Sequence, residues 1–304
     1  MYINIHYFIY FVIIVIMMKK KNIIFIYILI LIEFLVLSNS KIIVVSILKS
    51  SYMFFIKIFP SLFPTMLIGM ILVKNNVEIV IPKFIKNLFK KLFNFDDNMT
   101  NIFIMSIICG TPSNAIFINE YLKKRLINSK TAENLLCVTH FVNPLFVINT
   151  GINLFNSKTY GIIILLMLYL SNIIKAFILK RNFISCCNQN KTYKNKSIMQ
   201  SINESIKGTI YSLLNIFSVV ILFNMLTNLI RSIFNLNITS SFIINSILEM
   251  TGAITNLSLV NIPFKLFVAY YILSFGGLCI WMQVISSIND KNIHYKKYVL
   301  FRIL

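Results

Sequence analysis

Long apolar runs separated by short basic segments make up most of the chain. The clearest run, at 159–179, has about the 20 residues that a helix needs to cross a bilayer. Further runs lie at 3–18, 23–37, 100–118, 206–230, 242–260 and 264–288. The pattern predicts an all-α, polytopic helical membrane protein, with about eight spanning or re-entrant segments in two related halves.

Proline, glycine and polar residues interrupt several of these runs. The sequence reads FPSLFP at 59–64, GTPSNA at 110–115 and Asn-Pro at 143–144. Proline removes a backbone donor, and within a bilayer the freed groups are tolerated only where protein or water satisfies them. We therefore expect broken helices at these three places, with polar atoms at membrane depth.

Composition excludes a soluble enzyme and a disordered chain. Hydrophobic residues make up 58%, charged residues only 12%, and the mean hydropathy is +0.80. A soluble protein carries roughly 25% charged residues, and disorder requires low hydrophobicity. Much of the surface of this chain is therefore expected to face lipid.

The net charge of +20 comes from basic residues that lie between the apolar runs. This placement is typical of cytoplasmic loops rather than of nucleic-acid binding. The basic stretch 180–207 is expected to be cytoplasmic, as is the tail with Lys291, Lys296, Lys297 and Arg302. The predicted organisation is N-terminal hydrophobic segments at 1–41, a first half at 42–180, a basic loop at 181–205 and a second half at 206–304.

Three segments near the N-terminal side have alternative interpretations. Residues 1–17 are either an upstream extension, with translation starting near Met18, or an additional transmembrane helix. The segment 42–59 resembles an interfacial or partly buried helix. The segment 79–95 alternates basic and apolar residues as a helix on a membrane surface does, although a connecting helix would have the same pattern.

Catalytic and metal-binding patterns are missing from the sequence. The five cysteines and three histidines have no ligand spacing, and no Walker loop, nucleophile elbow or HExxH pair is present. We expect no enzyme activity, no cofactor, no metal site and no nucleic-acid partner.

Glu249 is the acid whose position matters most, because it lies inside the apolar run 242–260. A carboxylate at mid-bilayer costs at least about 2.5–3.5 kcal/mol on insertion scales, so it is normally paired or functional. Glu249 either faces a substrate path or pairs with a lysine or an asparagine. Similarly, Gly276-Gly277 is either a hinge or a site of close helix packing, and Gln283 beyond it favours a cavity.

Half-helices that meet at a break place free N–H groups and a positive dipole end in the protein interior, where they can hold an anionic group. The residues at and beside the breaks are therefore the candidates for substrate binding. They are Pro112, Ser113, Asn114, Asn143, Glu249, Thr251, Gly276, Gly277 and Gln283.

The interrupted segments, taken in order, resemble a known family. The motifs are FPSLFP at 59–64, GTPSNA at 110–115 with Glu120, HFVNPLFVINTG at 140–151, EMTG at 249–252 and FGGLCIWMQV at 275–284. In this order they resemble sporulation integral membrane proteins of the YlbJ type. Those proteins are built on the nucleoside-recognition Gate domain and are similar to concentrative nucleoside transporters.

The resemblance implies a multi-pass protein of a bacterial cell membrane, in the mother-cell-derived membrane around the forespore. It further implies transport of a small anionic solute, with dipicolinic acid the best match. Two alternatives stay open: a structural or assembly protein of the spore envelope, and a nucleoside carrier.

Overall fold

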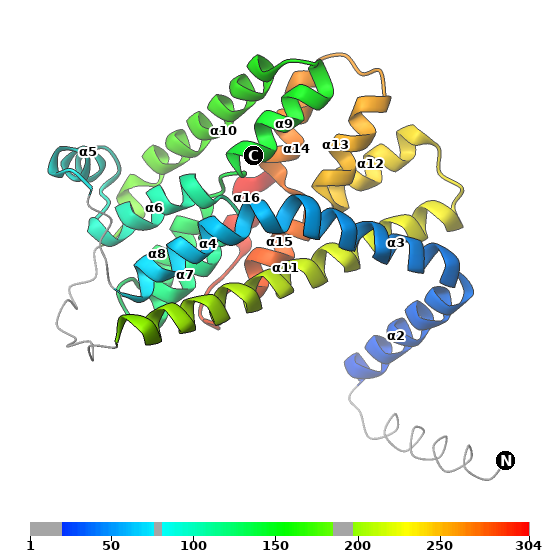
Figure 1. Cartoon of the computed structure of the whole chain (residues 1–304), viewed down its shortest axis with the longest axis horizontal. Coiled ribbons are helices and arrows are strands. Elements are labelled where there is room, and N and C mark those ends of the chain that lie inside the picture. Colours follow the sequence, from blue (N-terminus) through cyan, green and yellow to red (C-terminus); the bar gives the residue numbers. More distant parts are fainter. Residues whose placement is uncertain (1–19, 76–80, 185–196, 304) are drawn as a thin grey trace, which may run out of the picture.

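The computed structural model describes residues 20–75, 81–184 and 197–303, and within these ranges every regular element is helical. The all-α prediction is therefore confirmed (Figure 1). The predicted N-terminal extension at 1–17 lies outside the described residues.

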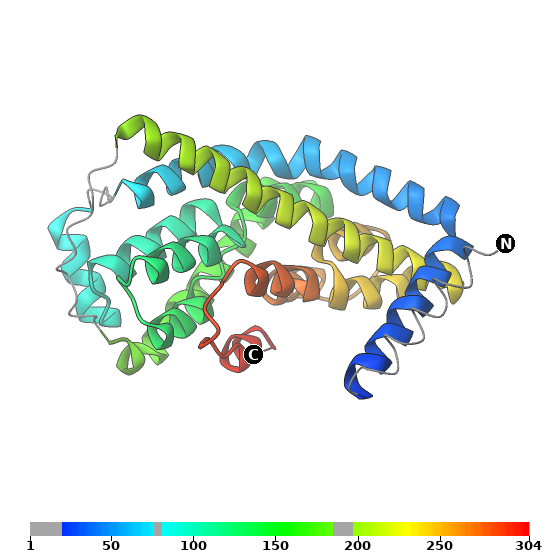
Figure 2. The same ribbon diagram turned by 90° about the horizontal axis from the view of Figure 1, so that it is seen from below.

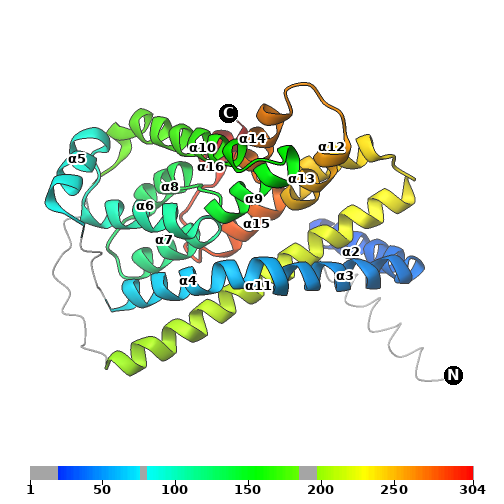
Figure 3. The ribbon, with the colours of Figure 1, turned by 45° about the horizontal axis from the view of Figure 1, so that its top comes forward.

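The first helices form a bent rod. Helix α2 (Lys20–Ser38) meets α3 (Ser40–Met53) at an angle of 92°. Helix α3 continues through a π-helical turn (Phe54–Ile58) into α4 (Phe59–Lys74), and this rod lies along α11 (Figure 3).

The predicted break at 59–64 is wrong, because the chain stays helical through both prolines. Pro60 directly follows the π turn, whose wider i→i−5 bond from Phe59 N to the Phe54 carbonyl accommodates a proline within a continuous helix. Pro64 lies inside α4, and the Thr65 hydroxyl next to it donates to the Leu62 carbonyl at 3.1 Å.

Helix α5 (Lys83–Phe93) is the amphipathic helix predicted within 79–95. The ring of Phe89 packs 5.6 Å from that of Phe103, while Phe84 on the other face is 70% exposed. Lys86 pairs with Asp97 at 2.7 Å, at the start of the next helix.

Among the described residues, three helical segments are long and apolar enough to cross a membrane: Lys158–Ile178 (α10), Ile198–Ile233 (α11) and Lys265–Ser286. The bent pair Ile30–Ser38 and Ser40–Ile56 makes a fourth if it counts as one span. These segments indicate a multi-pass integral membrane protein. At about 1.5 Å per residue the 36 residues of α11 extend about 54 Å, which exceeds the thickness of a hydrocarbon core of about 30 Å.

Helix α11 begins earlier than expected, inside the predicted loop 181–205. Ser197 and Gln200 form a reciprocal capping box that starts the helix at Ile198. At the other edge of this loop a short 3-10 turn (Lys180–Asn182) follows α10.

Shorter helices come in pairs that are separated by breaks. These pairs are α6 (Asp97–Cys109) with α7 (Ser113–Lys123), α8 (Ser129–Val138) with α9 (Pro144–Phe155), α12 (Ile238–Leu248) with α13 (Met250–Leu259), and α14 (Lys265–Phe275) with α15 (Gly277–Ser286). Breaks were predicted at 110–112 and at 143–144, and both are confirmed.

Two of these pairs are hairpins. Asn98 near the start of α6 donates to the Leu126 carbonyl just beyond α7 at 3.4 Å, so the two outer ends lie together. In the second hairpin, a Cβ on Gly252 of α13 would lie 3.0 Å from the side-chain nitrogen of Asn245 on α12. The α12–α13 pair therefore folds back at Glu249.

The C-terminal segment turns back after α15 and lies at the lower edge of the view in Figure 2. Helix α16 (Lys296–Ile303) packs on α8, and His294 N donates to Glu133 Oε1 at 2.7 Å. In the connection, Ser129 donates to Asp290 Oδ2 at 2.7 Å, and this hydrogen bond, with one from the Asn292 backbone, lowers the pKa of Asp290.

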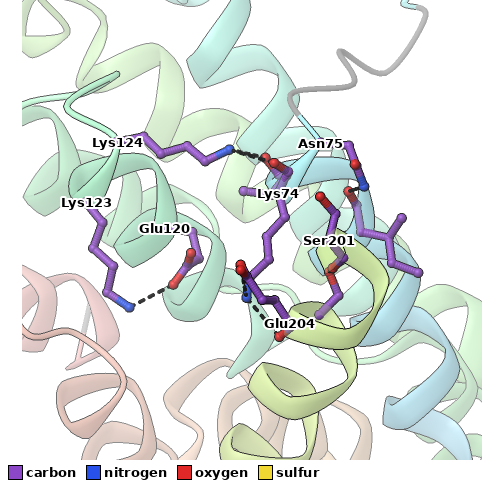
Figure 4. Close-up of polar contacts among 10 residues, drawn as sticks. Lys74, Asn75, Glu120, Lys123, Lys124, Ser201 and Glu204 are labelled. Carbon is purple, nitrogen blue, oxygen red and sulfur yellow. Dashed lines mark hydrogen bonds and ion pairs between the residues drawn. The ribbon is translucent and has the colours of Figure 1, made fainter. Parts of the chain in front are cut away.

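Polar contacts join the ends of α4, α7 and α11 (Figure 4). Lys74 Nζ donates to the Glu204 carbonyl at 2.8 Å and lies 3.8 Å from its carboxylate. Lys124 donates to the Val73 carbonyl. The basic loop that follows α7 therefore lies at the same end of the molecule as the start of α11.

Candidate functional site

The tip of the first hairpin sits on the break between α8 and α9. The backbone N–H and the hydroxyl of Thr111 both donate to the Phe141 carbonyl, at 2.6 and 3.1 Å. Gly110 has a φ of +75°, and a Cβ there would lie 2.8 Å from the backbone nitrogen of Asn143. Glycine is therefore required for the two breaks to approach this closely.

The second hairpin meets the break between α14 and α15 in a comparable way. Gly277 has a φ of +74°, and a Cβ there would lie 3.1 Å from the Leu248 carbonyl oxygen and 3.3 Å from the Glu249 backbone nitrogen. The predicted pair Gly276-Gly277 thus separates two half-helices and also allows the hairpin tip to pack closely.

His140 connects the two sets of breaks. A Cβ on Gly276 would lie 3.1 Å from His140 Nε2, so the imidazole touches the α14–α15 break. Asn172 of α10 donates to the His140 carbonyl at 2.8 Å, and the Tyr298 hydroxyl lies 3.4 Å from Nδ1. We call the segments 110–112, 139–143, 249 and 276–277 the break junction.

Arg302 places a buried positive charge beside the break junction. Its Nη2 donates to the Cys137 carbonyl at 2.7 Å and its Nη1 to the Ser274 carbonyl at 3.5 Å. These carbonyls belong to the last turns of α8 and α14, where the helix dipole is negative and a cation is stabilising. The guanidinium also lies over the Tyr298 ring, 5.8 Å from its centroid.

Several buried polar atoms around the junction have no hydrogen-bond partner among the residues that the structure describes. They are Ser113 Oγ, Asn114 Oδ1, His140 Nε2, Asn172 Oδ1 and Arg302 Nε. Buried polar groups are nearly always paired in native proteins. This set therefore has the hydrogen-bonding capacity to hold a polar ligand or water.

The first group of predicted residues lies where the hairpin and the broken span meet. Pro112, Ser113 and Asn114 begin α7, and Asn114 Nδ2 donates to the Thr139 hydroxyl at 3.1 Å. Asn143 caps α9, its Oδ1 accepting from Leu145 N at 3.0 Å and from Phe146 N at 3.4 Å.

Glu249 caps the N-terminus of α13. Its carboxylate accepts from Thr251 N at 2.8 Å, from the Thr251 hydroxyl at 2.5 Å and from Gly252 N at 2.6 Å. These bonds differ from the predicted pairing with lysine or asparagine, and they fix the tip of the second hairpin. Thr251, also predicted, belongs to this cap.

Gln283 lies away from the break itself. It is buried on α15, seven positions beyond Gly276 and therefore about 10 Å along a helix. Its amide nitrogen contacts Cys279 Sγ at 3.3 Å. Within the described part of the chain, none of its hydrogen bonds reaches the break junction.

Sequence reasoning missed three residues of the site: His140, Asn172 and Arg302. His140 comes three residues before the Asn-Pro break, a proximity that the sequence does show. Arg302 belongs to the tail that is predicted to be cytoplasmic, and the structure buries this residue, with only 2% of it exposed. The sequence does show that Arg302 follows Tyr298 by four positions, a spacing that places both residues on the same face of a helix.

Comparisons with protein-family models, curated proteins and solved structures find no match to this chain. The candidate site therefore rests on the geometry of its own residues. That geometry places eight of the nine predicted positions, all except Gln283, at the two hairpin tips and at the breaks that these tips touch.

Proposed function

We propose that this protein is a secondary transporter that moves a small organic anion across the membrane by way of the break junction. The observation that carries the proposal is the convergence of two hairpin tips and two broken helices around His140, next to the buried Arg302. Discontinuous helices at mid-membrane are a common way to build a substrate site in such transporters.

The order of elements supports two related halves. In the first, α4 precedes the α6–α7 hairpin and the α8–α9 broken span; in the second, α11 precedes the α12–α13 hairpin and the α14–α15 broken span. The first hairpin begins at the end of the molecule where Lys74 and Glu204 meet, and the second follows the opposite end of α11. Two hairpins that reach the centre from opposite ends of the molecule favour a central site that is exposed alternately to the two sides of the membrane.

The charges near the junction favour an anion. Arg302 forms no ion pair among the described residues, so its positive charge is not neutralised by a neighbouring carboxylate. Helices α7 and α15 begin at the junction without a side-chain cap, and their positive dipole ends add to the attraction. At α13 the Glu249 carboxylate already occupies the helix N-terminus.

The resemblance to sporulation membrane proteins of the YlbJ type makes dipicolinic acid the substrate that we propose. It is a small aromatic dianion, and its two carboxylates could accept hydrogen bonds from the Ser113 hydroxyl, from Arg302 Nε and from the uncapped N–H groups at the start of α7 and α15. On this proposal the protein works in the membrane around the forespore.

The decisive experiment is uptake of radiolabelled dipicolinate into proteoliposomes that contain the purified protein, with uridine in parallel. We expect saturable dipicolinate flux in the native protein. We expect none in Glu249→Gln or Gly277→Leu, because the first disturbs the cap and the second cannot fit against Leu248. Both variants should still insert into the membrane.

Three outcomes would contradict the proposal in different ways. Normal flux in both variants would reject the site, and flux of uridine alone would make the protein a nucleoside carrier. No flux of either solute, from protein shown to be folded, would favour a structural or assembly role. In a structural protein, cysteines placed at Ser113 and Thr251 would not react with a water-soluble thiol reagent. In a transporter they should react, and added dipicolinate should slow the reaction.

A further inference from the structure

A groove of about 650 Å³ lies between the start of α3 and the end of α11, remote from the break junction. From α3 it is lined by Lys41, Val45 and Lys49, which are spaced by four and so share one face of the helix. From α11 it is lined by Asn228 and Arg231, which are three positions apart and so share one face, and Asn235 lines it from the turn just beyond the helix.

Three cations thus meet in one groove. Lys41, Lys49 and Arg231 are all exposed, and the described residues that line the groove include no acid. Helix α3 begins beside Lys41 without a side-chain cap, which adds partial positive charge. The groove is therefore strongly attractive to an anion and has no internal counter-charge.

The position of the groove along α11 corresponds to the headgroup layer of a membrane. Helix α11 carries two basic residues, Lys207 and Arg231, which lie about 36 Å apart at about 1.5 Å per residue. A hydrocarbon core of about 30 Å fits between them. Arg231 and the groove then lie at one interface, opposite the end where Lys74 meets Glu204.

The surface beside the groove is apolar and faces outward. On α3, Val44 is 54% exposed and Leu48 is 64% exposed; at the C-cap of α11, Phe234 is 68% exposed. A ligand with a negative headgroup and long hydrocarbon chains matches both parts of this surface. A soluble anion would contact only the three cations and would leave the apolar surface uncovered.

We propose that this groove binds the headgroup of an anionic phospholipid, with the phosphodiester between Lys41, Lys49 and Arg231 and the acyl chains against the neighbouring apolar face. Basic pockets between transmembrane helices bind such headgroups by this combination of charge and hydrocarbon contact. The bound lipid would join α3 to the end of α11. This proposal does not depend on which solute the protein transports.

The test is native mass spectrometry of the full chain, together with its thermal unfolding in neutral detergent as phosphatidylglycerol is added. We expect retained phosphatidylglycerol and a rise in the unfolding temperature, and neither effect with phosphatidylcholine. The triple variant Lys41→Gln/Lys49→Gln/Arg231→Gln should bind about a hundredfold more weakly, because each basic residue near the surface contributes about a factor of five. A matched control, Lys130→Gln/Lys158→Gln/Lys291→Gln, removes equal charge outside the groove and should bind normally.

Lys41→Arg/Lys49→Arg keeps the charges and should retain binding, which separates lost binding from lost folding. Equal binding of phosphatidylcholine would overturn the proposal, as would equal losses in the two triple variants. Inorganic phosphate is the control that separates a lipid headgroup from a soluble anion. If phosphate alone raises the unfolding temperature of the native protein as much as the lipid does, the occupant is a soluble anion and the lipid assignment is wrong.

Discussion

Arg302 donates a hydrogen bond of 2.7 Å to the carbonyl of Cys137, although the two residues are 165 positions apart. The bond joins the last helix to the end of α8, immediately before the break that contains His140. A second donor of the same guanidinium reaches Ser274, just before the other broken span. One side chain thus contacts the ends of two half-helices that belong to different halves of the chain.

Replacing this cation tests whether its charge serves transport. In Arg302→Gln we expect dipicolinate uptake to fall at least about tenfold, because a hydrogen bond or contact to a charged group is worth about 1.5–3 kcal/mol. Arg302→Lys keeps the charge and should retain part of the activity. Proteoliposome uptake checks both, with the exposed Lys296→Gln as control. Full uptake in Arg302→Gln would show that the charge is only structural.

The role of Glu249 can be divided into capping and charge. Asparagine is also a good N-cap residue, so Glu249→Asn should fold normally, whereas Glu249→Ala should lose about 1 kcal/mol of stability. If the carboxylate acts only through the bonds to Thr251 and Gly252, Glu249→Asn should transport normally as well.

Thermal unfolding in detergent and uptake in proteoliposomes measure these two properties separately. A Glu249→Asn protein that is stable but inactive would show that capping does not account for the whole role of Glu249, and it would assign a direct function to the negative charge. An unchanged stability of Glu249→Ala would contradict the cap itself.

The contact between α9 and α10 depends on two glycines. A Cβ on Gly151 would lie only 2.1 Å from the backbone nitrogen of Gly161, and neither backbone can yield as a flexible side chain does. We expect Gly151→Ala to cost at least about 1–3 kcal/mol, the usual cost of overpacking. Small residues commonly permit such close packing of membrane helices.

Gly208→Ala is the matched control for this substitution. Its Cβ would lie 3.0 Å from the end of the flexible Met70 side chain, so the helix should keep its stability or gain up to about 1 kcal/mol from better helix propensity. Equal unfolding temperatures of the two variants in detergent would refute the close contact between α9 and α10.

The hydroxyl of Thr139 connects the first hairpin to the α8–α9 break. It accepts from Asn114 Nδ2 at 3.1 Å and donates to the Leu135 carbonyl at 2.7 Å. Thr139→Val keeps the shape but leaves the Asn114 amide without this acceptor, and we expect a loss of about 1–3 kcal/mol.

Thr150→Val provides the comparison, because the buried Thr150 hydroxyl bonds only to the Phe146 carbonyl of its own helix in the described structure. This variant should be nearly neutral. Chemical denaturation of both proteins in detergent gives the two values. A loss at Thr150 as large as that at Thr139 would contradict a specific link between hairpin and break.

Local sequence was sufficient to predict two kinds of feature. The run 159–179 became α10 because its length and uniform hydrophobicity leave no other stable structure in a bilayer. The break at 110–112 followed from glycine and proline, which limit the helix whatever surrounds them.

Tertiary contacts determined what the sequence did not reveal. The prolines at 60 and 64 were expected to break a helix, but a π turn placed just before them keeps the rod continuous against α11. The contacts of Arg302 have no local sequence signal, because its partners, the carbonyls of Cys137 and Ser274, belong to distant parts of the chain. No local pattern identifies a backbone carbonyl as the acceptor of a distant cation.

The π turn at Phe54–Ile58 also bears on how the chain tolerates the loss of a residue. A π turn holds one residue more than the α-helical turn that it replaces, so deleting one residue from it would restore regular helix and leave the phase of α3 nearly unchanged. Deleting one residue from the regular helix between Lys49 and Met53 would instead rotate the first part of α3 by about 100°. Lys41 and Lys49 would then leave the groove, and Val44 and Leu48 would no longer face outward. The protein should therefore tolerate the loss of a residue from the π turn more readily than the same loss within α3.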